Sequence, residues 1–156
     1  MVKKPKIGIF KYNLGSVLKV KLIREKQEKE KFAETQRKLE EEKRKEEEIK
    51  NNHRQAQNAL REHFEEGKKI DFSQVFLRQN QIENLKEKVE VQKKIAIKAE
   101  EINEEQRTKL VDSMKEKKII EKDKENKLKA WKDLMNKEEM KFIDEIATTK
   151  YNNEVI

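Results

Sequence analysis

The stretch EGKKIDFS, residues 66–73, decides the fold of this chain. It contains Gly67, the last of three glycines, and neither glycine nor proline follows it. Glycine is common just beyond the end of a helix, because it adopts a positive φ without strain. Asp71 and Ser73 carry side-chain oxygens that can cap the start of a following helix. The stretch therefore predicts a short connection between two helices.

Residues with a high helix propensity fill the chain on both sides of this connection. We expect one helix over about residues 14–66, a connection over about 67–71 and a second, longer helix over about 72–152. Residues 1–156 would then form a single coiled-coil unit. Because the connection is short, the helices should pack antiparallel, with residue i facing about residue 138 − i.

Apolar residues recur in alternating steps of three and four, the heptad spacing of a coiled coil. The positions in the first helix include Leu18, Phe32, Leu39, Ile49, Ala56 and Leu60, and those in the second include Ile82, Leu85, Val89, Ala96, Ala99 and Leu110. The fold class is therefore all-α, an antiparallel coiled-coil hairpin. A parallel homodimer of one long rod is the competing interpretation.

The line of heptad positions that should face the other helix, here called the seam, is polar at many places. Glu25, Glu42 and Glu46 fall on it in the first helix, and Lys117 and Lys124 fall on it in the second. Polar residues in a seam lower stability and help to fix the register. We therefore expect a marginally stable protein that depends on its partners.

Composition excludes most other classes of protein. Charged residues make up 46 % of the chain and hydrophobic residues 33 %, too little apolar material for a layered globular core. There is no cysteine, no apolar signal segment at the N-terminus and no apolar run long enough to span a membrane. These features predict a cytoplasmic protein.

The positive charge lies at one end of the sequence. The net charge is +7, and the residues before Glu25 carry seven bases and no acid, whereas the rest of the chain is balanced. Nucleic-acid binding is disfavoured, since no reading motif is present and a binding stripe usually follows a whole face. The basic end instead predicts an anionic docking surface.

Catalytic chemistry is not predicted. Three scattered glycines cannot form a phosphate-binding loop, and His53 and His63 are too far apart for a metal-binding pair on a helix. The many carboxylates alternate with lysine and arginine, as on a solvated helix face. We therefore expect no enzyme activity, no catalytic or metal-binding residue and no cofactor.

The second helix should continue past its partner and carry an apolar stripe. With the expected pairing, the first helix ends opposite about residue 124. Beyond that point Trp131, Met135, Phe142 and Ile146 follow one another in steps of four, seven and four. A lone amphipathic helix with such a stripe predicts a groove on a partner protein.

Four stretches together resemble the FliJ family, small cytoplasmic coiled-coil proteins of the flagellar type III export apparatus. They are FKYNLGSVLKVK at 10–21, IENLKEKVEVQ at 82–92, EKKIIEK at 116–122 and FIDEIA at 142–147. The resemblance implies a stalk similar to that of rotary ATPases, located at the cytoplasmic face of the inner membrane at the flagellar base. It also implies three kinds of partner: the hexameric export ATPase FliI, the export gate protein FlhA and export chaperones.

The resemblance also suggests where two of these partners bind. The paired ends of the chain would enter the ATPase pore, with the candidate residues Lys3, Lys4, Lys6, Lys11, Trp131, Met135, Phe142 and Ile146. The gate would contact the second helix just past the connection, with the candidate residues Phe72, Phe76, Ile82 and Leu85. Ile82 and Leu85 could instead close the end of the seam.

Two other functions remain open from the sequence. The chain could be the equivalent stalk of a virulence type III secretion system, although the FIDEIA stretch near the end favours the flagellar system. It could also be a structural coiled-coil spacer, which would need neither a basic end nor an apolar overhang.

Overall fold

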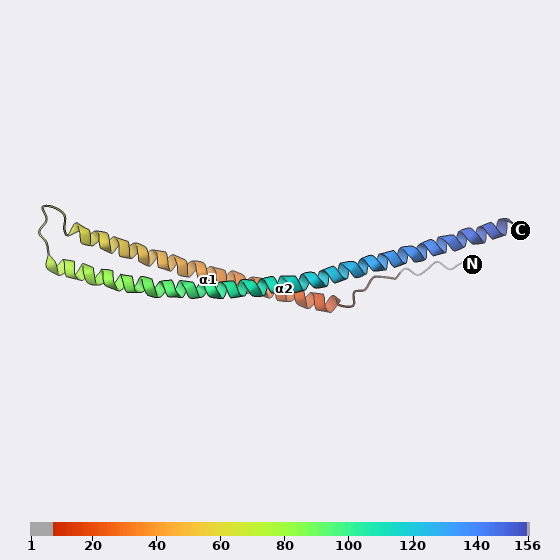
Figure 1. The fold of residues 1–156 in the computed structure, drawn as a ribbon, viewed down its shortest axis with the longest axis horizontal. Helices are drawn as coiled ribbons and strands as arrows, with labels where there is room; N and C mark the ends of the chain where they lie inside the picture. Colours follow the sequence, from red (N-terminus) through yellow and green to blue (C-terminus); the bar gives the residue numbers. More distant parts are fainter. Residues whose placement is uncertain (1–7, 156) are drawn as a thin grey trace. The chain divides into compact units, whose positions relative to one another are not determined.

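A computed structural model describes residues 8–155 and contains two long helices, α1 (Gly15–Glu62) and α2 (Phe72–Glu154). No strand occurs among these residues. The two helices pack against each other and run antiparallel, joined by the connection at residues 63–71 (Figure 1). The predicted all-α hairpin with a longer second helix is confirmed.

The connection has the chemistry that the sequence predicts. Gly67 has φ = 83°, the one positive φ among the described residues. The Asp71 carboxylate accepts hydrogen bonds from the backbone amides of Ser73, at 3.0 Å, and Gln74, at 3.4 Å. Asp71 therefore caps α2, because it satisfies backbone donors that have no partner within the helix.

The α-helix α1 ends four residues earlier than predicted. After Glu62, backbone bonds of the tighter i to i+3 type take over, for example from His63 N to the Leu60 carbonyl at 3.1 Å. Such tightened turns are common at helix C-termini, where the last carbonyls lack partners. The connection is longer than the sequence suggested for this reason.

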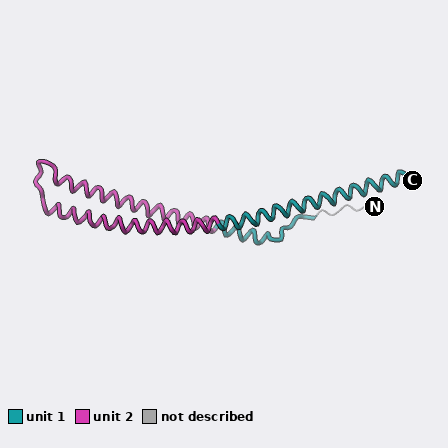
Figure 2. The backbone as a smooth tube through the Cα atoms, viewed as in Figure 1, with its two compact units in different colours: residues 1–26, 112–156 teal, residues 27–111 magenta. Residues whose placement is uncertain are grey.

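Contacts divide the chain into two compact units (Figure 2). Unit 1 comprises residues 1–26 and 112–156, and unit 2 comprises residues 27–111. Each unit contains one segment of α1 and one segment of α2. That these units act as a single coiled-coil unit stays a prediction.

The seam follows an uninterrupted heptad pattern through both segments of each helix. From Leu14 to Leu60, the residues reached by alternating steps of four and three are all buried or half-buried, and so are those from Val75 to Ile120 reached by steps of three and four. Contacts across the seam join residues whose numbers add to between 134 and 143, as for Thr35 and Asn103, whose side chains hydrogen-bond at 3.0 Å. The expected antiparallel register is therefore correct.

Polar residues in the seam of unit 2 form complementary pairs. The Gln92 amide donates to the Glu42 carboxylate at 2.5 Å and to the Glu42 carbonyl at 3.1 Å. Two heptads further along α2, the Gln106 amide donates to the carboxylate and the carbonyl of Glu28. Both glutamines are buried. These two amide–carboxylate layers satisfy polar groups that would be costly to bury alone.

Unit 1 contains a charged layer of the same kind. The Lys117 ammonium lies 2.6 Å from the carboxylate of Glu25, which is itself buried. Glu116 binds both Lys21, at 2.8 Å, and Arg24, at 3.4 Å. A partly buried ion pair adds little net stability, but either residue alone would be strongly destabilising, so such pairs favour one register.

The amide–carboxylate layers predict a specific dependence of stability on pH. Hydrogen bonds from Gln106 and Gln92 lower the pKa of the Glu28 and Glu42 carboxyls, against a smaller opposing effect of burial. A carboxyl whose folded pKa is lowered stabilises the fold above its unfolded pKa, about 4.3, and this contribution is lost as the pH falls through the folded value.

We therefore expect the double variant Gln92→Ala/Gln106→Ala to unfold about 5 °C below the wild type at pH 7. Between pH 7 and pH 3 it should lose less stability than the wild type does. Thermal melts followed by far-UV circular dichroism at several pH values measure both effects. Gln57→Ala, at an exposed site on α1, is the matched control. Parallel pH profiles of double variant and wild type would contradict this account.

Candidate partner-binding surfaces

The end of α2 in unit 1 presents the predicted apolar stripe. Trp131, Met135 and Phe142 are half-buried, and Ile146 is 38 % exposed. Trp131 contacts the ring of Phe10, with centroids 5.9 Å apart and planes tilted by 53°. The stripe is therefore covered at one place by a segment that precedes α1.

This segment, residues 8–13, is not helical and crosses from the start of α1 to α2. Beside Phe10, Tyr12 anchors it: its hydroxyl donates to the Asp123 carboxylate at 2.5 Å and lies 3.3 Å from the Ile120 carbonyl. The Lys127 ammonium lies 5.5 Å from the Tyr12 ring centroid and 3.2 Å from Asp123. The sequence suggested that α2 has no partner where it continues past α1. In the structure, Phe10 and Tyr12 contact α2 there.

The charges around Tyr12 fix its protonation. Burial, the hydrogen bond to Asp123 and the charge of Asp123 raise the pKa of the Tyr12 hydroxyl to about 12. The same hydrogen bond, followed by the bond from Lys127, lowers the pKa of the Asp123 carboxyl. Tyr12 is therefore a neutral donor and Asp123 a charged acceptor across the neutral range, so this contact holds at physiological pH.

The basic part of the candidate ATPase site is only partly described. Lys11 is exposed and lies between the two anchoring aromatics. Lys3, Lys4 and Lys6 lie outside the described residues. The structure thus brings Lys11 and the stripe into the same unit.

The four candidate gate residues separate into two pairs. Phe72 and Phe76 are 78 % and 64 % exposed, whereas Ile82 and Leu85 are half-buried at seam positions that face α1. Val75 lies between these two phenylalanines in the sequence and is buried, which was not predicted. Only the phenylalanines are therefore free to contact another protein through most of their surface.

Further exposed apolar residues near the connection were missed from the sequence. Phe64, Ile70 and Leu77 are each about half exposed or more. Their position near the connection could have identified them, because α1 has ended there and no longer covers apolar side chains. With Phe72 and Phe76 they form an apolar group at this end of unit 2, here called the bend cluster.

The described residues contain neither a cluster of three metal-ligating side chains nor a helix long and apolar enough to cross a membrane. His53 is half-buried at a seam position, with no hydrogen-bond partner for its Nε2 atom in the described part of the chain. At its candidate sites the structure shows the apolar stripe, the bend cluster and the exposed Lys11.

Two unequal antiparallel helices that pack along a heptad seam define the class as all-α coiled-coil hairpin proteins. The family model described as "Flagellar FliJ protein" matches residues 10–155. The chain belongs to the FliJ family and is a component of flagellar type III protein export. This decides for the flagellar system over the virulence stalk. No curated protein and no solved structure matched the chain.

Contact between Phe10 and Trp131 predicts a fluorescence response, because Trp131 is the only tryptophan in the chain. Phe10→Ala removes an aromatic pair worth about 1 kcal/mol and exposes the indole to water. We expect its emission to shift to longer wavelength and its quenching by acrylamide to increase, with helix content unchanged. Phe76→Ala, in the other unit, should alter neither; equal spectra for wild type and Phe10→Ala would contradict the contact.

Proposed function

We propose that this protein is the stalk of the flagellar export ATPase: it binds the FliI-like hexamer and promotes its assembly and activity. The observation that carries the proposal is the apolar stripe of Trp131, Met135, Phe142 and Ile146 on the part of α2 that has no helical partner. Membership of the FliJ family over residues 10–155 supports it. An amphipathic helix of this kind fits the groove-binding mode of recognition.

Charge and apolar area have different parts in this proposal. Lys11, with Lys3, Lys4 and Lys6 at the same end of the sequence, would attract an acidic pore rim and raise the rate of association. The aromatic residues would supply the binding free energy, because buried tryptophan and phenylalanine anchors dominate most interfaces.

We also propose that the bend cluster contacts the FlhA-like export gate, and that export chaperones are further partners at the cytoplasmic face of the flagellar base. Phe72 and Phe76 supply the exposed aromatic area for the gate contact. Ile82 and Leu85 would act mainly by closing the seam beneath them, since α1 covers half or more of each. A structural spacer without partners would need neither surface.

The ATPase proposal predicts unequal effects of matched substitutions. Trp131→Ala and Phe142→Ala should each weaken binding by about 2 kcal/mol, roughly thirtyfold, and reduce stimulation of ATP hydrolysis and hexamer assembly. Met140→Ala, which removes an exposed side chain of α2 outside the stripe, should change neither. Replacing the four lysines by glutamine should weaken binding mildly, and more at low salt.

A truncated chain that ends at Lys127 distinguishes the stalk proposal from the alternative that the end of α2 has no function. Its loss of ATPase stimulation, with the wild-type helicity of the remaining residues, supports the stalk. Full stimulation by this truncated chain, measured as phosphate release, would refute it.

The gate proposal predicts that Phe76→Gln weakens binding to the cytoplasmic part of the gate protein about tenfold while helix content stays constant. Calorimetric titration with purified gate protein measures the affinity. Ile97→Gln, a similarly exposed apolar site on α2 away from the bend, serves as the control. Leu85→Gln should lower both helicity and binding; binding that depends on Leu85 but not on Phe76 would contradict the proposal.

A further inference from the structure

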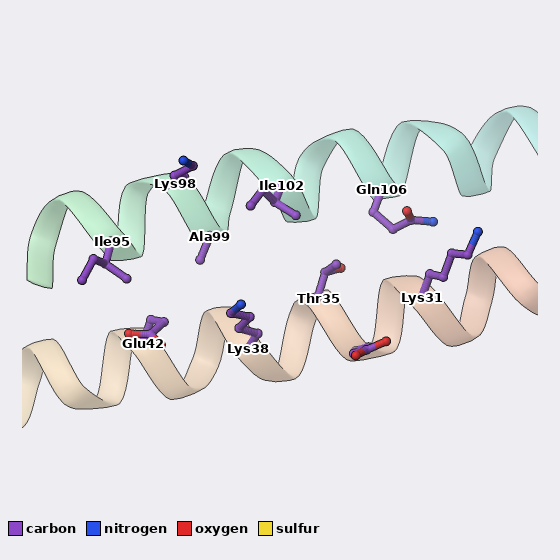
Figure 3. Close-up of a pocket in the computed structure, with 10 residues that line it drawn as sticks. Lys31, Thr35, Lys38, Glu42, Ile95, Lys98, Ala99, Ile102 and Gln106 are labelled. Atoms are coloured by element: carbon purple, nitrogen blue, oxygen red, sulfur yellow. The ribbon is translucent and has the colours of Figure 1, made fainter.

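A groove of about 510 Å³ lies along the seam of unit 2, away from both surfaces discussed above. It is lined from α1 by Lys31, Glu34, Thr35, Lys38 and Glu42, and from α2 by Ile95, Lys98, Ala99, Ile102 and Gln106. Figure 3 shows Ile95 and Ala99 extending from α2 toward α1, and Lys31 extending from α1 toward α2. Thr35 and Ala99 are small side chains at seam positions, so each fills less of the space beside the seam than a larger residue would.

The floor of the groove is apolar and accessible. Ile95 and Ile102 are each 45 % exposed. Ile95 and Ile102 directly precede seam positions, and coiled coils usually carry charged residues at such flanking sites. Ile95 and Ile102 therefore widen the apolar stripe of α2 beyond the part that α1 covers. Such a wide stripe is typical of a helix that packs against more than one neighbour.

The rim of the groove carries excess positive charge. Its lining contains three lysines, Lys31, Lys38 and Lys98, and two acids, Glu34 and Glu42. Of the lining lysines, Lys31 lies 3.6 Å from Glu28, whereas Lys38 and Lys98 form no ion pair within the described residues.

Acidic side chains at the groove do not cancel this charge. Glu34 is exposed, and Glu42 is already bound by Gln92 and by Lys45, at 3.3 Å. Lys38 and Lys98 have no carboxylate of the described residues within ion-pair distance, so these two lysines can pair with a third partner.

We propose that this groove is a docking site for an amphipathic α-helix of a partner protein, with acidic residues flanking its apolar stripe. Ile95 and Ile102 are two helical turns apart, about 10 Å, the spacing of i and i+7 anchors on a docked helix. The bound helix would lie along the seam as a third helix of the coiled coil. Its carboxylates would pair with Lys38 and Lys98, and charge complementarity thereby selects the partner.

A second copy of this chain fits the groove less well than an acidic helix. The apolar stripe near the end of α2 is flanked by Lys132, Lys137 and Lys141 as well as by acids. A helix whose flanks carry only acids avoids placing any of those lysines against the lysines of the rim, since like charges at an interface are unfavourable. The proposal does not depend on the ATPase or gate contacts, because none of the groove residues belongs to either surface.

A peptide selection with the full chain tests this proposal. The probe is a displayed library of helical peptides with leucine at the core heptad positions and random residues at the flanking positions. We expect the selected peptides to be enriched in aspartate and glutamate at the flanks. Their affinity, measured by fluorescence anisotropy, should fall at least about tenfold for Ile95→Gln/Ile102→Gln. For Lys38→Glu/Lys98→Glu, the preference should change to basic flanks.

The matched control is Lys93→Glu/Ile97→Gln, which changes one exposed lysine and one exposed isoleucine of α2 outside the groove. It should bind like the wild type, and circular dichroism should show equal helix content for all variants. Selected peptides without acidic flanks, or acidic peptides that bind the Ile95/Ile102 variant equally well, would overturn the proposal. So would a dimer of the wild-type chain, seen by sedimentation, that the Ile95→Gln/Ile102→Gln variant abolishes.

Discussion

Hydrogen bonds from buried glutamine amides to glutamate carboxylates across the seam are the constraint on which unit 2 depends. Gln92 with Glu42 and Gln106 with Glu28 form two equivalent layers, with the Thr35–Asn103 bond between them. Apolar burial alone would specify the register weakly, since the buried apolar side chains of the described residues are mostly alanine, with one leucine and one valine. A shift by one heptad would separate each amide from its carboxylate and leave both without a partner, which is a larger penalty than the loss of a few apolar contacts. In unit 2, hydrogen bonds between polar seam residues thus fix the register that the few buried apolar side chains specify only weakly.

The fold could be predicted from the sequence because its determinants are local. Gly67, Asp71 and the uninterrupted heptads each act within a few residues of their own position, and the register follows from the place of the bend. What the sequence could not provide was the pairing of the polar seam residues. Glu25 and Lys117 were both expected to weaken the seam, yet they face each other and form an ion pair. Whether a polar seam residue is a liability or half of a pair depends on its partner across the seam, which is distant in the chain.

The candidate surfaces were predictable to a smaller extent. Heptad spacing identified the stripe around Trp131, because an apolar stripe beyond the paired region is visible in one helix alone. The segment with Phe10 and Tyr12 was not predicted to cover it, since residues 8–13 have no periodicity and their contacts bridge more than a hundred positions. Burial separated Phe72 and Phe76 from Ile82 and Leu85, which a run of apolar letters cannot do. The groove beside Ala99 also needed both helices, because its lining residues come from α1 as well as from α2.

The narrow range of the sums of facing residue numbers, 134 to 143, has a consequence for how proteins of this kind can change in length. An insertion in α1 alone would displace every residue on the N-terminal side of the insertion from its partner in α2, and any amide–carboxylate layer on that side would be lost. Only paired insertions of whole heptads, one in each helix at facing positions, preserve the seam. The paired region of such a hairpin can therefore lengthen only in steps of one heptad, about 10 Å each. Lengthening α2 beyond the paired region has no such restriction, so that end of the molecule is free to vary independently of the seam.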